Sequence, residues 1–198
     1  MPYSQFTLQE AVERFNLSLV DGEGFLTAQP IEPSATLAAF LQESLPLTGS
    51  ASEKARSESI IYPVLLEVKR ILQPGVSLFS GEEFNVDSSM GLNGVCDFIL
   101  SRSAERLLVQ APVVMMVEAK KADLTLGLGQ CVAEMVAAQR FNEAKQQNIS
   151  TIYGCISSGT QWRFLQLNKQ IITIDLIDYP LPPVPPILGL LVRMVSPG

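Results

Sequence analysis

The stretch Val113-Val114-Met115-Met116-Val117-Glu118-Ala119-Lys120 decides the fold. Its first five residues are apolar, which predicts a buried strand. The strand ends in Glu118 and Lys120, two positions apart, so in extended backbone both side chains point to the same face. Unpaired charge is expensive to bury. The two interpretations are therefore an ion pair where the strand leaves the core, and a site in which Glu118 binds a metal ion and Lys120 contacts a phosphate.

The overall composition is that of a soluble globular protein. The chain has 198 residues, of which 47% are hydrophobic and 17% are charged, enough for one well-buried domain with extensions. No apolar run is long enough for a transmembrane helix. The N-terminus lacks the basic region and apolar core of a signal peptide. We therefore expect a cytoplasmic protein with no membrane partner.

Several kinds of chemistry are excluded by residue type. The sequence contains no histidine, which rules out Ser-His and Cys-His catalysis and histidine metal centres. Cys96, Cys131 and Cys155 are far apart and have apolar neighbours, so we expect small buried residues. The net charge is −6, against the basic balance usual for nucleic-acid binders. The remaining chemistry must use carboxylates, Lys, Arg or a hard metal ion.

The chain alternates helical and strand patterns. We expect helices over residues 7–16, 34–44, 52–73, 126–145 and 187–195. We expect strands over residues 17–26, 76–86, 95–100, 113–120, 151–157, 162–167 and 170–178. Pro63 should kink the long third helix. This order predicts a mixed α/β sheet with helices packed against it.

The same patterns suggest a division of the chain into parts. Residues 1–50 are interpreted as an N-terminal helical extension packed on the core, residues 51–179 as the α/β domain, and residues 180–198 as a proline-rich apolar tail. The final helix could pack on its own domain or on a second subunit.

Polar residues that could carry chemistry follow the predicted elements in order. Glu58 lies on the long helix, Asp97 on a strand, Glu118 and Lys120 at the end of the next strand, and Gln130 on the following helix. This order resembles the PD-(D/E)XK nuclease superfamily. Its restriction-endonuclease-like αβββαβ core would span about residues 52–167, with a further C-terminal strand.

The resemblance implies a role for each of these residues. Asp97 matches the metal-binding Asp of that superfamily, and Glu118 with Lys120 matches its (D/E)XK element. Glu58 matches an acidic residue on the first helix of many members, and Gln130 matches a Gln of some subfamilies. Cys96 stands where the motif usually has Pro. Glu58 with Pro63, and the segment 158–164, are similar to the N-terminal nuclease domain of type I restriction motor subunits.

The implied chemistry is Mg²⁺-dependent hydrolysis of DNA. Asp97, Glu118 and the backbone carbonyl of Ala119 offer the hard oxygen ligands that Mg²⁺ prefers, and Mn²⁺ could substitute. Glu58 would complete the metal shell or hold a metal-bound water. The metal would lower the pKa of a bound water, and Lys120 would orient that water or stabilise the transition state. The resemblance leaves open a homodimer and a partner subunit of a restriction or repair system.

The candidate residues also have simpler structural interpretations, and the chain has alternative functions. Asp97 could cap a strand end, while Glu58 and Gln130 could lie on solvated helix surfaces. Trp162 and Phe164 are more typical of a hairpin core than of a base-stacking platform. The chain could also be a catalytically silent domain of the same fold that binds nucleic acid or protein. A third hypothesis is an interaction protein that uses its N-terminal helices and apolar tail.

Overall fold

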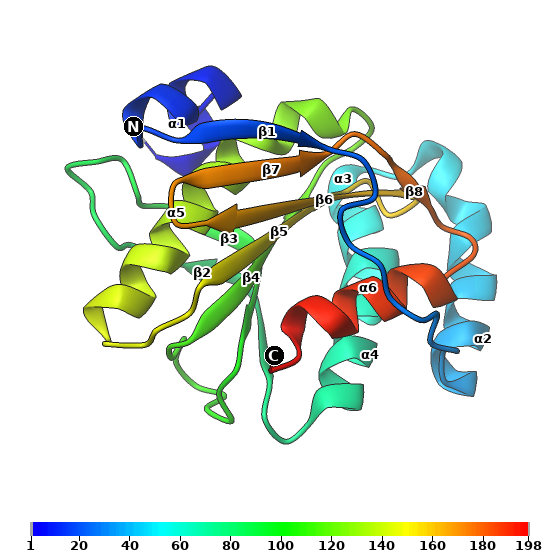
Figure 1. Cartoon of the computed structure of the whole chain (residues 1–198). Coiled ribbons are helices and arrows are strands. Elements are labelled where there is room, and N and C mark those ends of the chain that lie inside the picture. Colours follow the sequence, from blue (N-terminus) through cyan, green and yellow to red (C-terminus); the bar gives the residue numbers. More distant parts are fainter. Residues whose placement is uncertain (1, 198) are drawn as a thin grey trace.

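A mixed β-sheet with helices on both faces forms the protein, shown in Figure 1. The computed structural model describes residues 2–197. The strand order is β1-β7-β6-β5-β4-β3-β2, and β8 pairs with β6. The strands are β1 Ser18–Gly22, β2 Ser77–Glu83, β3 Val95–Ser101, β4 Val113–Ala119, β5 Thr151–Ser157, β6 Gln161–Asn168, β7 Ile171–Asp175 and β8 Tyr179–Pro180. The pairs β4–β5 and β1–β7 are parallel, and the other pairs are antiparallel. The predicted mixed α/β architecture is confirmed.

The helices cover the sheet in two layers. The α-helices are α1 Leu8–Arg14, α2 Ala35–Ser44, α3 Glu53–Arg56, α4 Tyr62–Leu72, α5 Leu128–Ala144 and α6 Pro185–Val195. Short 3₁₀ segments are η1 Tyr3–Gln5, η2 Leu45–Ser50 and η4 Leu124–Gly127, and η3 Ser57–Ile61 is a π-helix. Helices α1 and α5 share one hydrophobic core with the sheet, and α2, α4 and α6 share a second core on its other face. Within residues 2–197 no helix is both long and apolar enough to cross a membrane.

Strand β4 lies inside the sheet, and all of its residues are buried. Met116 contributes to the core beneath α5, whereas Met115 and Val117 contribute to the core beneath α4 and α6. A strand covered on both faces needs a continuous apolar sequence rather than an alternating one. The prediction of a buried strand here is confirmed.

The long helix predicted over residues 52–73 is built in three sections. Helix α3 leads into the π-helix η3, and α4 follows, with Pro63 in its first turn. The N–H of Tyr62 donates to the carbonyl of Ser57, five residues earlier. Proline lacks the N–H that a regular helix interior requires, and the wider π turn immediately precedes it.

Residues before position 50 are part of the same packed body. Strand β1 adds an edge to the sheet beside β7, and the buried Tyr3 hydroxyl donates to the carbonyl of Phe84 at 2.6 Å. A Cβ atom at Gly129 would lie 2.2 Å from the carbonyl oxygen of Phe6. Glycine at this position therefore allows the N-terminal backbone to cross α5 beside Gln130.

The C-terminal helix α6 packs on its own chain. Its Leu188 and Leu191 are fully buried in the core that also contains residues of α4 and β4. This settles where the apolar helix packs, which the sequence left open.

Trp162 is fully buried, with its indole N–H donating to the Gly159 carbonyl at 3.0 Å, and Phe164 is also fully buried. The expected core roles of these aromatics and of the buried, free cysteines are confirmed.

Asn142 connects α5 to the start of β4. Its amide donates to the Val113 carbonyl at 2.6 Å, and its carbonyl accepts from the Val113 N–H at 2.8 Å.

We expect Asn142→Leu to lower the free energy of unfolding by about 2–5 kcal/mol, because each buried polar group left unpaired costs about 1–3 kcal/mol. Urea unfolding, with the exposed Asn148→Leu as control, measures the loss. Equal stability of the two variants would contradict this role.

Candidate active site

The site begins where β3 and β4 stop pairing. Their last ladder pair at this end is Phe98 with Val117, and the next residues along the two strands are Asp97 and Glu118. Here the Asp97 carboxylate accepts a hydrogen bond from the Ala119 N–H at 2.8 Å. The Asp97 side chain thus replaces a strand-to-strand backbone bond, while Ala119 still pairs with β5 on its other side.

Glu118 is held from two directions. Its side chain forms an ion pair with Lys120 through Oε1, and its Oε2 accepts from Gln130 Nε2 at 2.8 Å. Only 3% of the Glu118 side chain and 18% of the Lys120 side chain are exposed. The two side chains share a face, as predicted. They also form the ion pair that the simpler interpretation of this segment expects.

Glu134 is a member of this group that the sequence analysis did not single out. It is fully buried on α5, and its Oε1 accepts from Gln130 Nε2 at 3.1 Å. Its Oε2 is buried with no hydrogen-bond partner among the described residues. The available signal was a lone carboxylate in the apolar run 131–138, four residues after Gln130, because that spacing places both side chains on one helix face.

The electrostatics of the site are dominated by burial of negative groups. Burial, followed by the nearby Asp97 charge, raises the pKa of Glu118 to about 8 despite the contact with Lys120. Burial, followed by the Glu118 charge, raises the pKa of Glu134 well above that of an ordinary carboxyl. Burial alone would lower the pKa of Lys120, but its interactions with Glu118 outweigh this and raise it. Full ionisation of these carboxyl groups is therefore unfavourable beside the single Lys120 ammonium, and a further cation would favour it.

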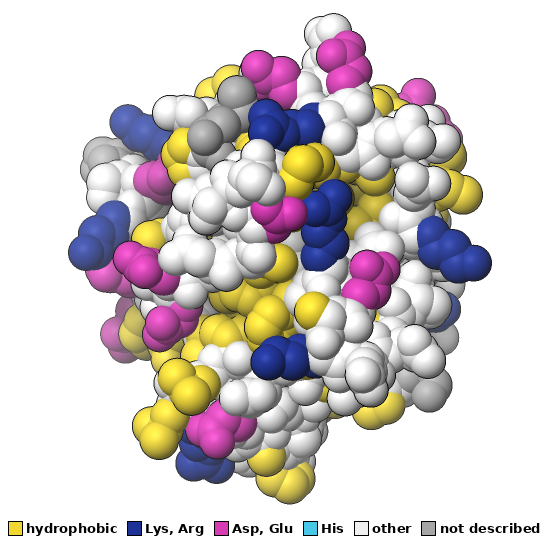
Figure 2. All heavy atoms as spheres, turned by 90° about the vertical axis from the view of Figure 1, so that its left-hand side faces the viewer, with side chains coloured by type: hydrophobic (Ala, Val, Ile, Leu, Met, Phe, Trp, Pro, Cys, Tyr) yellow, Lys and Arg dark blue, Asp and Glu magenta, His cyan; other side chains and the backbone are white. Residues whose placement is uncertain are grey.

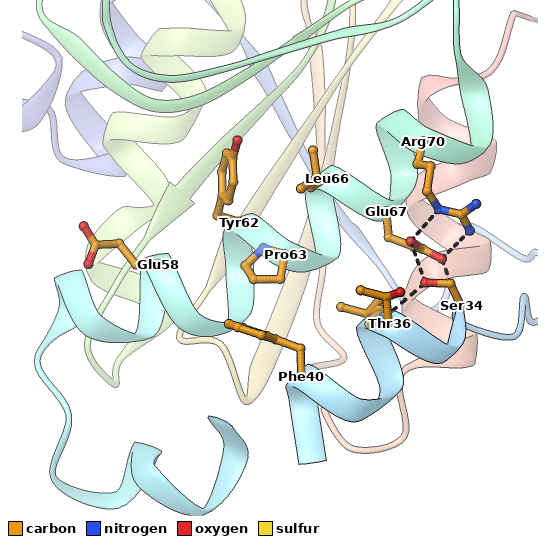
Figure 3. A pocket seen from close by; sticks show the side chains of 10 residues that line it. Ser34, Thr36, Phe40, Glu58, Tyr62, Pro63, Leu66, Glu67 and Arg70 are labelled. Carbon is orange, nitrogen blue, oxygen red and sulfur yellow. Dashed lines mark hydrogen bonds and ion pairs between the residues drawn. The ribbon is translucent and has the colours of Figure 1, made fainter. Parts of the chain in front are cut away.

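Glu58 lies apart from this group. Its side chain is 68% exposed and forms an ion pair with Lys54 at 3.8 Å. It lines one end of a pocket of about 490 Å³ between α2 and α4, where Figure 3 shows it well away from Glu67 and Arg70. The plainer interpretation of Glu58 as a solvated helix residue describes these surroundings, and no hydrogen bond or ion pair among the described residues joins it to Glu118.

A different carboxylate from this helical region acts on the site. The charge of Glu53, the first residue of α3, contributes to the raised pKa values of Glu118 and Lys120. Sequence reasoning did not consider Glu53, because it follows the capping Ser52 and has the appearance of an ordinary first-turn acid.

The donor set suits a hard cation. Asp97 and Glu118 supply carboxylate oxygens, and Mg²⁺ commonly uses one or two carboxylates while keeping several waters. Close to them, Glu134 Oε2 is buried without a hydrogen-bond partner. Among residues 2–197 no cluster of three or more His, Cys, Asp or Glu side chains is arranged as a metal cage. Asp97 and Glu118 are the residues that would hold such a cation.

Comparison with known proteins does not assign the chain to a family. No protein-family model and no curated protein sequence matches it.

The raised pKa of Glu118 predicts a pH-dependent stability. Because the folded state holds this proton more tightly than the unfolded chain, the stabilisation is complete below pH 4.5 and is lost as the pH rises toward about 8. In EDTA, wild type should therefore lose stability across this range relative to Glu118→Gln, which cannot ionise. Denaturant unfolding at several pH values measures the difference, with the exposed Glu83→Gln as control. A pH-independent difference between wild type and Glu118→Gln would contradict the shift.

Proposed function

We propose that the protein is a metal-dependent nuclease of the PD-(D/E)XK type that hydrolyses phosphodiester bonds in DNA. One observation carries the proposal: Asp97, Glu118 and Lys120, which the family resemblance singles out, lie at the adjoining ends of β3 and β4, and Gln130 of α5 contacts Glu118 there. An ion pair at a strand exit would need only Glu118 and Lys120. The Asp97 carboxylate and the Gln130 amide are additional features that a nuclease site uses.

The order of elements supports the same proposal. Helices α3 and α4 precede the antiparallel strands β2, β3 and β4, and α5 then leads to β5, parallel to β4. This is the αβββαβ order expected of a restriction-endonuclease-like core. Strands β1 and β7 extend the sheet beyond β6.

The residues have separable tasks in this proposal. Asp97 and Glu118 would hold Mg²⁺ or Mn²⁺, with the Ala119 carbonyl as a third oxygen. When bound, the metal supplies Lewis acidity toward water and phosphate. Lys120, released from Glu118, would donate to a phosphate oxygen or orient the attacking water. Gln130 would keep the Glu118 carboxylate turned toward the end of the strand.

DNA binding would have to rely on local charge. The net charge is −6, and in Figure 2 basic side chains are interspersed with acidic ones around an apolar hollow. Phosphate contacts made by Lys and Arg supply most non-specific affinity for DNA. We therefore expect weak, salt-sensitive binding to DNA by the isolated chain, with a second copy or a partner subunit supplying further contacts.

A second candidate function is a silent domain of the same fold that binds nucleic acid or protein. It is favoured by the bonds at Glu118, because Lys120 and Gln130 already occupy both of its carboxylate oxygens. A domain that never binds metal could keep such a closed ion pair as a structural feature.

The two functions are separated by a cleavage assay. Single- and double-stranded DNA are incubated with wild type, Asp97→Ala, Lys120→Ala and the exposed Lys121→Ala in Mg²⁺, Mn²⁺ or EDTA. We expect cleavage only with metal, retained in Lys121→Ala and reduced at least about 100-fold in the first two variants, because charge stabilisation in the transition state is lost. Absence of cleavage on both substrates in either metal would favour the silent domain.

Glu58 provides an internal test of which carboxylates belong to the site. It is exposed and paired with Lys54, so Glu58→Gln should cleave at the wild-type rate with the same Mn²⁺ dependence. Titrating Mn²⁺ in the cleavage assay compares the two proteins. A rate as low as that of Asp97→Ala would instead place Glu58 at the metal, as the family resemblance implies.

A further inference from the structure

The unusual group on α5 is the Glu134 carboxyl. It is fully buried, yet one of its oxygens has no partner among the described residues. A buried polar atom left unpaired destabilises the fold, and an apolar side chain of the same shape would avoid that cost. A residue that weakens the core in this way calls for a role in the site beside it.

The hydrogen bond that Glu134 Oε1 accepts leads toward that site. Gln130 Nε2 donates both to Glu134 Oε1 at 3.1 Å and to Glu118 Oε2 at 2.8 Å. An amide NH₂ group has two hydrogens, so these acceptors use its full donor capacity. Because one carboxyl oxygen on each side accepts from this nitrogen, the amide oxygen is turned away from Glu118.

We propose that Glu134 is a positioning residue that fixes the Gln130 amide, and through it holds the Glu118 carboxylate in the geometry that binds the divalent cation. The inference rests on the metal site of the proposed function. Partners that orient a metal ligand typically contribute 10–100-fold in metal affinity or activity. Glu134 acts by accepting one hydrogen bond, so a neutral acceptor of the same shape should replace it.

The test measures Mn²⁺ binding to the full chain by calorimetry. Glu134→Leu and Gln130→Leu should each weaken the Kd about tenfold or more, and the double variant should lose no more than either alone, because the two residues form one chain of contacts. Glu134→Gln should bind Mn²⁺ like wild type, since its amide oxygen can accept from Gln130.

A matched control lies on the same helix. Gln139 and Glu143 form the same pair at the same spacing, with Gln139 Nε2 donating to Glu143 Oε1 at 3.2 Å on the exposed surface. Glu143→Leu should leave Mn²⁺ binding unchanged. Thermal unfolding in EDTA should show Glu134→Leu at least as stable as wild type, because the unpaired buried oxygen is gone. A purely structural role predicts the reverse: lower stability with unchanged Mn²⁺ affinity.

The outcomes separate this inference from the proposed function. Wild-type affinity in Glu134→Leu, a loss in Glu134→Gln as large as in Glu134→Leu, or additive losses in the double variant would each overturn the positioning role. Absence of Mn²⁺ binding in wild type would overturn it as well. Mn²⁺ binding with the predicted variant pattern but without DNA cleavage would support the positioning role and overturn the nuclease activity.

Discussion

The carboxyl group of Glu118 is buried at the end of β4, so neighbouring residues must supply the hydrogen bonds and charge that water would otherwise provide. Lys120 supplies charge and Gln130 an amide donor, but Asp97 and Glu134 bring further carboxyl groups into the same low-dielectric region. Like charges that share a buried site raise one another's pKa values. Ionising all of these carboxyl groups together therefore requires more positive charge than Lys120 supplies, and a divalent cation is the simplest addition that would provide it.

The position of α5 is what makes this arrangement possible. Asn142 attaches its C-terminal half to the start of β4, and Gly129 lets the N-terminal segment cross close to its first turn. On β5, a Cβ at Gly154 would lie 2.4 Å from the Met135 sulfur, so the absence of a side chain there allows the helix to approach the sheet. Gln130 reaches Glu118, and Glu134 reaches Gln130, because α5 packs closely on the sheet.

Local sequence patterns were sufficient for most of the core but not for its edges. The apolar run of β4 and the long helix α5 could be read directly, because burial on both faces demands such runs. The role of the N-terminal segment could not be read from local sequence patterns. Strand β1 has mostly exposed residues and is defined by pairing with β7, about 150 residues later in the chain. Tyr3 likewise owes its burial to a distant contact with Phe84.

The candidate site shows the same division. Asp97, Glu118, Lys120 and Gln130 could be proposed from their order along the chain and its resemblance to a nuclease family. Sequence alone could not decide between the metal and the solvated interpretations of Glu58. A regular helix would place Glu58 on the side of Ile61 and Leu65, but the intervening π turn changes the rotation between them. Glu134 looked like an isolated polar residue in an apolar helix, and only its contact with Gln130 connects it to Glu118.

The claim that this group is built for a cation is tested most directly by a crystal structure of the protein grown with Mn²⁺, using anomalous scattering to locate the metal. We expect a peak between the Asp97 and Glu118 carboxylates, with the Lys120 ammonium displaced from Glu118 Oε1. An intact Lys120–Glu118 ion pair with no anomalous peak beside Asp97 would contradict it.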